Sequence, residues 1–88
     1  ADLRKNKIET AFSSWDGSHY KLERQIKEAM NDPKSYEHNK TTYSDHGDHL
    51  IVNTTFYGKN AFGGTILNEI RAKTDIEGNV IEIIYQNP

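Results

Sequence analysis

The segment "HLIVNTTFY", residues 49–57, constrains the fold more than any other part of the sequence. Its side chains alternate with the two-residue period of a β-strand. One face of the predicted strand carries Leu50, Val52, Thr54 and Phe56. A sheet this small would leave its apolar face in water unless another element covered it. The sequence therefore predicts a sheet that is packed on one side.

Three further segments have the character of strands. Residues 38–44 are rich in Thr and Tyr, residues 65–74 alternate like residues 49–57, and residues 80–85 form a short apolar run. The turn sequences "DHGD" and "DIEGN" lie between them. Successive strands with short connections predict an antiparallel meander.

A helix over about residues 18–31 is expected to cover the sheet. Its apolar stripe, at helical spacing, consists of Leu22, Ile26, Ala29 and Met30. Ser18 is the predicted N-cap, and Pro33 ends the helix because it pushes Asp32 out of the helical region.

The N-terminal segment allows a shorter helix. Ile8, Ala11, Phe12 and Trp15 recur at helical spacing, and residues 1–7 are expected to be a tether or a frayed end. The chain is thus predicted to be a single α+β domain, 1–88, with two layers: one main helix on a three- to four-stranded antiparallel sheet. The predicted core is Phe12, Trp15, Leu22, Ile26, Met30, Tyr36, Leu50, Val52, Phe56, Ile66, Ile70, Ala72, Ile81 and Ile83.

Composition excludes several classes of function. The 88 residues include no cysteine, so a disulfide framework and a cysteine-ligated zinc site are unavailable. The net charge is −2, and acidic residues are interspersed with the basic ones, so nucleic-acid binding is not expected. The apolar runs are far shorter than the roughly 20 residues of a membrane span, so this segment is not expected to insert into a membrane.

The segment "FYGKNAFGGT", residues 56–65, resembles a phosphate loop only superficially. The lysine of such a loop directly follows the second glycine, where Gly64 stands here, and a strand rather than a helix is predicted to follow. A turn between two strands is the better interpretation. Phe62 at its tip either folds back onto the core or is presented to a partner, and the sequence favours the core.

Two groups of polar residues could carry chemistry. His38, His46, Asp48 and His49 are possible ligands of zinc or copper, although a polar turn around Gly47 explains the same residues. Asp16, Ser18 and His19 are adjacent in sequence, which does not supply the geometry of a catalytic triad. No catalytic residue and no cofactor are predicted, and a hydrolytic role for the histidines and carboxylates is the weakest alternative.

Three blocks of the chain together resemble a known family. These are "FSSWDGSHYKLERQIKEAMNDPKSYEH", "DHLIVNTTFYGKNAFGG" and "AKTDIEGNVIEI", and the resemblance spans Phe12 to Ile84. The family consists of small bacterial domains of uncharacterised activity that occur as soluble parts of membrane-anchored or envelope proteins. Two positions depart from the family pattern: Ser14, where Ala is common, and Tyr57, where a basic residue is common. The resemblance implies an extracytoplasmic location on a tether and a non-enzymatic role, and it supplies no catalytic residue.

The first functional hypothesis is a non-catalytic binding or interaction module of a bacterial envelope protein. Its partner would be a protein or another envelope component, or a second copy of the chain bound through a strand edge, and the contact residues would be Tyr57, Lys59, Asn60 and Phe62. The alternative is a small-molecule- or metal-binding protein that uses the His38, His46, Asp48 and His49 region. A cytoplasmic location is not ruled out by the sequence, because the absence of cysteine fixes no compartment.

Overall fold

The computed structural model describes residues 2–88 and confirms the α+β fold with an antiparallel sheet. The elements in chain order are α1 (Asp2–Glu9), α2 (Tyr20–Ala29), the 3-10 turn η1 (Pro33–Ser35), β1 (Glu37–Asp45), β2 (Leu50–Lys59), β3 (Thr65–Thr74) and β4 (Val80–Asn87).

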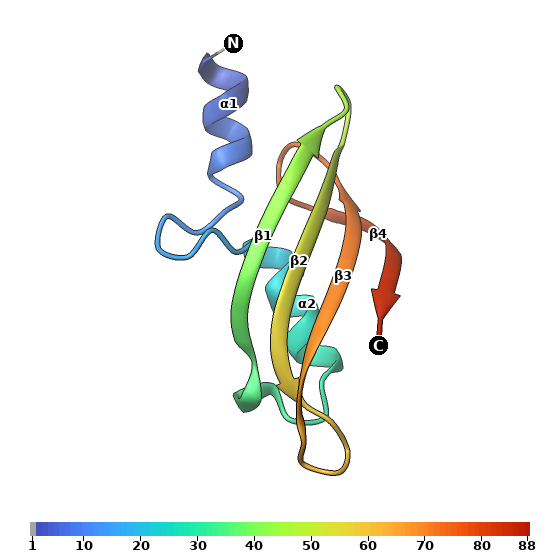
Figure 1. The fold of residues 1–88 in the computed structure, drawn as a ribbon. Coiled ribbons are helices and arrows are strands. Elements are labelled where there is room, and N and C mark those ends of the chain that lie inside the picture. Colours follow the sequence, from blue (N-terminus) through green and yellow to red (C-terminus); the bar gives the residue numbers. More distant parts are fainter. Residues whose placement is uncertain (1) are drawn as a thin grey trace.

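The sheet is a meander with the strand order β1-β2-β3-β4. Each strand is antiparallel to the next, and the register places Val52 between Tyr43 on β1 and Ala72 on β3. Helix α2 lies across one face of this sheet (Figure 1). The two-layer arrangement follows from the alternation along β2, which puts the apolar side chains on the face toward α2.

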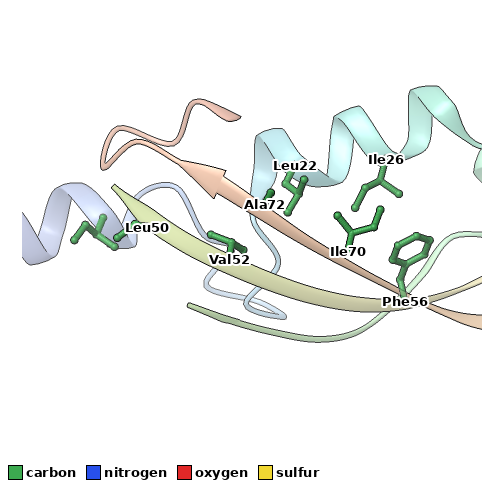
Figure 2. Packing of buried hydrophobic residues seen from close by; sticks show 8 residues of the cluster. Leu22, Ile26, Leu50, Val52, Phe56, Ile70 and Ala72 are labelled. Atoms are coloured by element: carbon green, nitrogen blue, oxygen red, sulfur yellow. The ribbon is translucent and has the colours of Figure 1, made fainter. Parts of the chain in front are cut away.

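The core lies between α2 and the two central strands, and Ile8 of α1 also contributes to it. Leu22 and Ile26 point from α2 toward the sheet, where Ile70 and Ala72 lie on β3 (Figure 2). The cluster of buried residues is Ile8, Leu22, Ile26, Leu50, Val52, Phe56, Ile70 and Ala72. Phe12, Met30, Tyr36 and Ile83 from the predicted core are partly buried against this cluster, and Ile66 is half-buried.

Helix α2 is shorter than expected, and its cap differs. The predicted N-cap Ser18 is wrong, because the side chain of His19 caps the helix by accepting a hydrogen bond from the backbone N–H of Leu22. Ser18 is buried, and its own N–H is bound to Asp16 Oδ1 at 3.0 Å. At the other end the helix stops at Ala29, which is exposed rather than part of a buried stripe.

The prediction that Trp15 belongs to the core is wrong. Residues 2–7, where a tether or frayed end was expected, lie in α1, and residue 1 lies outside the described residues. Helix α1 ends at Glu9, before the helical spacing can reach Trp15. The backbone N–H groups of Trp15 and Asp16 bind Ser13 Oγ instead, and the resulting turn leaves Trp15 94% exposed.

The placement of Ile81 in the core is also wrong. The register between β3 and β4 shifts twice, so that Ile83 pairs with Ala72 and Val80 with Thr74. Each shift adds one residue to β4, and these extra residues are Ile81 and Ile84. The bulges turn both isoleucines outward, with exposed fractions of 54% and 48%. Simple alternation along β4 places Ile84 outward beside the inward Ile83, but it could not predict the outward position of Ile81.

The face of the sheet opposite α2 has no covering element within residues 2–88 (Figure 1). Tyr57 and Leu67 pair across β2 and β3 on this face, and Arg71 stacks on the ring of Tyr85 with its guanidinium carbon 5.4 Å from the ring centroid. Among the described helices, none is long and apolar enough to cross a membrane.

Candidate binding site

In the loop between β2 and β3, hydrogen bonds fix the backbone and the aromatic side chain of Phe62 is exposed. Asn60 organises the loop, because its Oδ1 accepts hydrogen bonds from the N–H groups of Phe62 (3.0 Å) and Gly64 (2.9 Å). Backbone hydrogen bonds from Asn60 to the Gly64 carbonyl and from Gly63 to the Asn60 carbonyl close the same loop. Gly63 has φ +84°, which a side chain at this position would disfavour.

Phe62 is 97% exposed, so the expectation that it caps the core is wrong. The hydrogen bonds of Asn60 fix the tip of the loop in a conformation that leaves the Phe62 side chain in solvent. The phosphate-loop comparison fails for the reason expected, because β3 and not a helix follows Gly64.

The four residues predicted to contact a partner divide between two places. Tyr57 lies on the open face of the sheet, and Lys59 is held at the end of β2, where its N–H donates to Ser35 Oγ at 2.9 Å. Lys59 and Asn60 line a groove, whereas Tyr57 and Phe62 do not. The structure therefore brings Asn60 and Phe62 together on one loop, with Lys59 beside them and Tyr57 on a separate surface.

The groove has a volume of about 450 Å³ and lies between the C-terminal half of α2 and the sheet. Its floor is formed by Ile26, Met30, Phe56, Ile66, Ile70 and Ile83. This site was not predicted from the sequence, because its residues come from α2 and from three strands. Only the helical stripe and the strand alternation hinted at its apolar floor.

The four predicted metal ligands are not brought together. His46, Asp48 and His49 lie in or beside the β1–β2 turn, while His38 lies near the opposite end of β1, where it pairs with Phe56. Within residues 2–88, no three His, Cys, Asp or Glu side chains are grouped so that they could hold a metal ion.

The turn histidines instead stabilise the turn. The rings of His46 and His49 are stacked, with centroids 5.1 Å apart and an interplanar angle of 8°. His49 Nδ1 lies 2.6 Å from Asp48 Oδ1, and this hydrogen bond lowers the pKa of Asp48. His46 Nε2 lies 2.9 Å from Ser44 Oγ. These hydrogen bonds engage one ring nitrogen of each histidine and one carboxylate oxygen of Asp48, which are atoms that a metal ion would need as ligands.

His38 belongs to a separate polar cluster. Its Nε2 lies 2.8 Å from Thr41 Oγ1, which in turn lies 2.8 Å from Thr54 Oγ1. Asp16 Oδ2 is 3.8 Å from His38 Nδ1. The hydrogen bond from the Ser18 N–H is the main cause that lowers the pKa of Asp16, with a smaller contribution from His38. This cluster attaches the Ser13–Gly17 turn to β1.

The "WDGSH" residues do not form a nucleophile–base pair. His19 is 2% exposed, and its Nδ1 is occupied by the N–H of Leu22. Its Nε2 atom has no hydrogen-bond partner among the described residues. A base that is buried and committed to a helix cap cannot reach an external substrate.

Trp15 is the surface residue that the sequence interpretation missed. It lies on a turn held by the Ser13 hydroxyl and by the hydrogen bond from the Gly17 N–H to the Ser13 carbonyl. The sequence does contain a signal for this turn, since Ser13 and Gly17 flank Trp15. The helical spacing of the apolar residues nevertheless led to the prediction that Trp15 belongs to the core.

A scan against protein-family models, a search of curated proteins and a search of solved structures found no match to this chain.

Proposed function

We propose that this domain is a non-catalytic binding module of a bacterial envelope protein, and that it binds a protein partner through Phe62. The observation that carries the proposal is a phenylalanine that is 97% exposed on a loop fixed by four hydrogen bonds.

The energetics favour an interaction role for Phe62. A phenylalanine side chain gains roughly 1.5–3 kcal/mol when it moves from water into an apolar environment, and Phe62 gains almost none of this within the chain. A loop that is already ordered loses little conformational entropy on binding, so more of this free energy contributes to affinity. Buried aromatic anchors are the side chains that dominate many protein interfaces.

The envelope location is supported by the resemblance of three sequence blocks to tethered envelope domains. A binding role is favoured over the metal-dependent alternative because His38 lies far along β1 from His46 and His49. The partner belongs to the class of proteins with an apolar pocket that can take one aromatic ring, and a second copy of this chain is included in that class.

Site-specific photo-crosslinking tests the proposal. A photoreactive phenylalanine analogue is introduced at position 62 of the full-length protein in its own cells, and adducts are separated by mass. Trp15 is the matched control position, because it is also an aromatic residue on a rigid turn and is 94% exposed. We expect a discrete protein adduct from position 62 and none from position 15.

The substitution Phe62→Ala should abolish binding of the partner identified in this way, while Trp15→Ala preserves it. Both variants should unfold within about 0.5 kcal/mol of the parent protein, because neither side chain is buried. The absence of an adduct at position 62, or equal adducts at both positions, would contradict the proposal.

A further inference from the structure

The groove between α2 and the sheet exists because the helix is too short to cover its layer. Helix α2 has 10 residues and is about 15 Å long, whereas the 10 residues of β2 span about 33 Å. At the β2–β3 end the groove of about 450 Å³ remains. An apolar cavity of about 150 Å³ is sufficient to bind benzene, so the groove has room for a phenyl ring. Its apolar lining consists of Ile26, Ala29, Met30, Phe56, Ile66, Ile70, Ile83 and Pro88.

The exposed ring of Phe62 lies next to this groove and is not part of its lining. Asn60 and Ala61 line the groove, and Phe62 follows them directly in the sequence. The β2–β3 loop extends past the C-terminal end of α2, so the ring and the groove lie at the same end of the domain (Figure 1). The hydrogen bonds to Asn60 Oδ1 hold the loop in a conformation that leaves the ring 97% exposed. One copy of the chain therefore carries an unburied aromatic ring beside an apolar groove that this ring does not fill.

A second copy of the chain can use both features at once. In a two-fold symmetric dimer the same surface of both copies forms the interface, and every contact occurs twice. Because the ring and the groove lie at the same end of the domain, a two-fold axis at this end brings each ring to the groove of the other copy. One interface then buries both rings and covers both grooves.

The rim of the groove is suited to contact with an identical rim. Amide side chains both donate and accept hydrogen bonds, so a rim of amides can pair with itself. No Asp or Glu side chain contributes to the lining, so none repels its counterpart in a second copy. Lys59 is part of the lining, but the alternation along β2 places its side chain on the face of the sheet opposite to that of Phe56. The amide residues of the lining are Gln25, Asn31, Asn60, Asn68 and Gln86.

From these observations we infer that the domain forms a two-fold symmetric dimer in which Phe62 of each copy enters the groove of the other copy. The inference rests on the proposed function, because it names the protein that receives Phe62. A phenylalanine buries roughly 150–250 Å², so two rings and the groove surface beneath them amount to roughly 600–1,000 Å². Stable interfaces bury roughly 1,200–2,000 Å², so the dimer is weak, with a Kd on the order of 0.1–1 mM.

NMR over a range of protein concentrations tests the dimer. The 88-residue protein is diluted from about 2 mM to about 0.05 mM, which spans the expected Kd. We expect the methyl signals of Met30, Ile66 and Ile83 to shift along one dimerisation curve. In an equal mixture of isotope-labelled and unlabelled protein, we expect a nuclear Overhauser effect between the Phe62 ring of one copy and the Met30 methyl group of the other.

Two pairs of variants test the ring and the groove. Phe62→Ala should weaken dimerisation at least about tenfold, whereas Trp15→Ala, which removes a ring that is 94% exposed outside the groove, should leave it unchanged. Ala29 is exposed and lines the groove, so Ala29→Arg should block the groove and weaken dimerisation to a similar extent. Ser14→Arg is its matched control, because it adds the same charge at an exposed position outside the groove.

Several results would overturn the inference. These are signals that do not depend on concentration, a Phe62–Met30 contact within a single copy, and equal effects of a variant and its control. A protein that stays monomeric but gives a photo-crosslink from position 62 to a different protein also overturns the second copy as partner, and the proposed binding role of Phe62 then stands. The absence of both a dimer and any crosslinked adduct would overturn the proposed function as well.

Discussion

The imidazole Nδ1 atom of His19 accepts a hydrogen bond from the backbone N–H of Leu22 at 3.2 Å, so a buried titratable side chain closes the first turn of α2. The ring also packs edge-on against Phe12, with centroids 5.0 Å apart. Protonation of Nδ1 would remove the acceptor and place a charge in the core. The stability of the domain should therefore depend on the neutral form of this residue.

Burial lowers the pKa of His19, and the charge of Lys21 adds to this effect, while Asp75 opposes it. The folded pKa thus lies below the unfolded value of about 6.5. Between these two values the unfolded chain binds more protons than the folded chain, so stability falls as pH falls below about 6.5. The slope from this residue is at most about 1.4 kcal/mol per pH unit.

Urea unfolding between pH 7.5 and 5 measures this dependence. The variant His19→Asn keeps a capping acceptor but does not titrate in this range. It should be less stable at pH 7.5, because the packing against Phe12 is lost, and its stability should change less with pH. The other three histidines are common to both proteins, so equal pH dependences would contradict the assignment to His19.

Asn60→Ala should loosen the β2–β3 loop without unfolding the domain. The substitution removes the acceptor of the Phe62 and Gly64 N–H groups, each worth about 1 kcal/mol. Amide hydrogen exchange at these two positions should accelerate, while exchange at Ile70 in the core should stay slow. Asn60→Asp retains the acceptor and serves as the control. Unchanged exchange in Asn60→Ala would mean that the backbone hydrogen bonds alone hold the loop.

The attachment of α1 should depend on Asp45. Arg4 binds the carboxylate of Asp45 at 2.7 Å and also donates to the Gly47 carbonyl. The hydrogen bond from Arg4 is the largest cause that lowers the pKa of Asp45, followed by the hydrogen bond from the Gly47 N–H. Asp45→Asn should accelerate amide exchange in α1 and leave exchange in α2 unchanged.

Glu9→Gln is the control for this experiment, because it breaks the Lys5–Glu9 pair within the same helix. If Glu9→Gln had as large an effect as Asp45→Asn, helix propensity rather than attachment to the hairpin would limit the order of α1.

Alanine substitutions of two leucines on neighbouring strands should show that one face of the sheet is buried and the other is exposed. Leu50 is fully buried toward α2, whereas Leu67 on β3 is 50% exposed on the open face. Leu50→Ala should lower the free energy of unfolding by about 3 kcal/mol, because it removes buried methyl groups and leaves a cavity. Leu67→Ala should change it by about 0.5 kcal/mol or less. Similar losses at both sites would indicate that the open face is covered in solution.

The sequence predicted those parts of the fold that depend on periodicity. The alternation along β2 correctly placed Leu50, Val52 and Phe56 toward the helix, and the spacing of Leu22 and Ile26 correctly identified the covering helix. Prediction from periodicity failed where local hydrogen bonds or β-bulges interrupt the regular spacing of the apolar residues. The hydroxyl of Ser13 turns Trp15 outward.

The candidate site was less predictable than the fold. Lys59, Asn60 and Phe62 were singled out because polar and aromatic residues surround a glycine turn, yet the exposure of Phe62 depends on how Asn60 binds the loop. The groove depends on the length of α2 relative to the strands and on which side chains converge from four elements. Neither property can be derived from the pattern of any one segment.

The meander also determines how the chain can reach its native state. Each strand pairs with the strand next in sequence, so the sheet forms by closing only short turns, which costs little chain entropy. The contact of α2 with β3 spans a much longer stretch of chain, from Ile26 to Ile70. Native topology with many local pairings favours fast folding. The docking of one ten-residue helix onto a sheet assembled from hairpins is therefore the step on which the folding rate should depend.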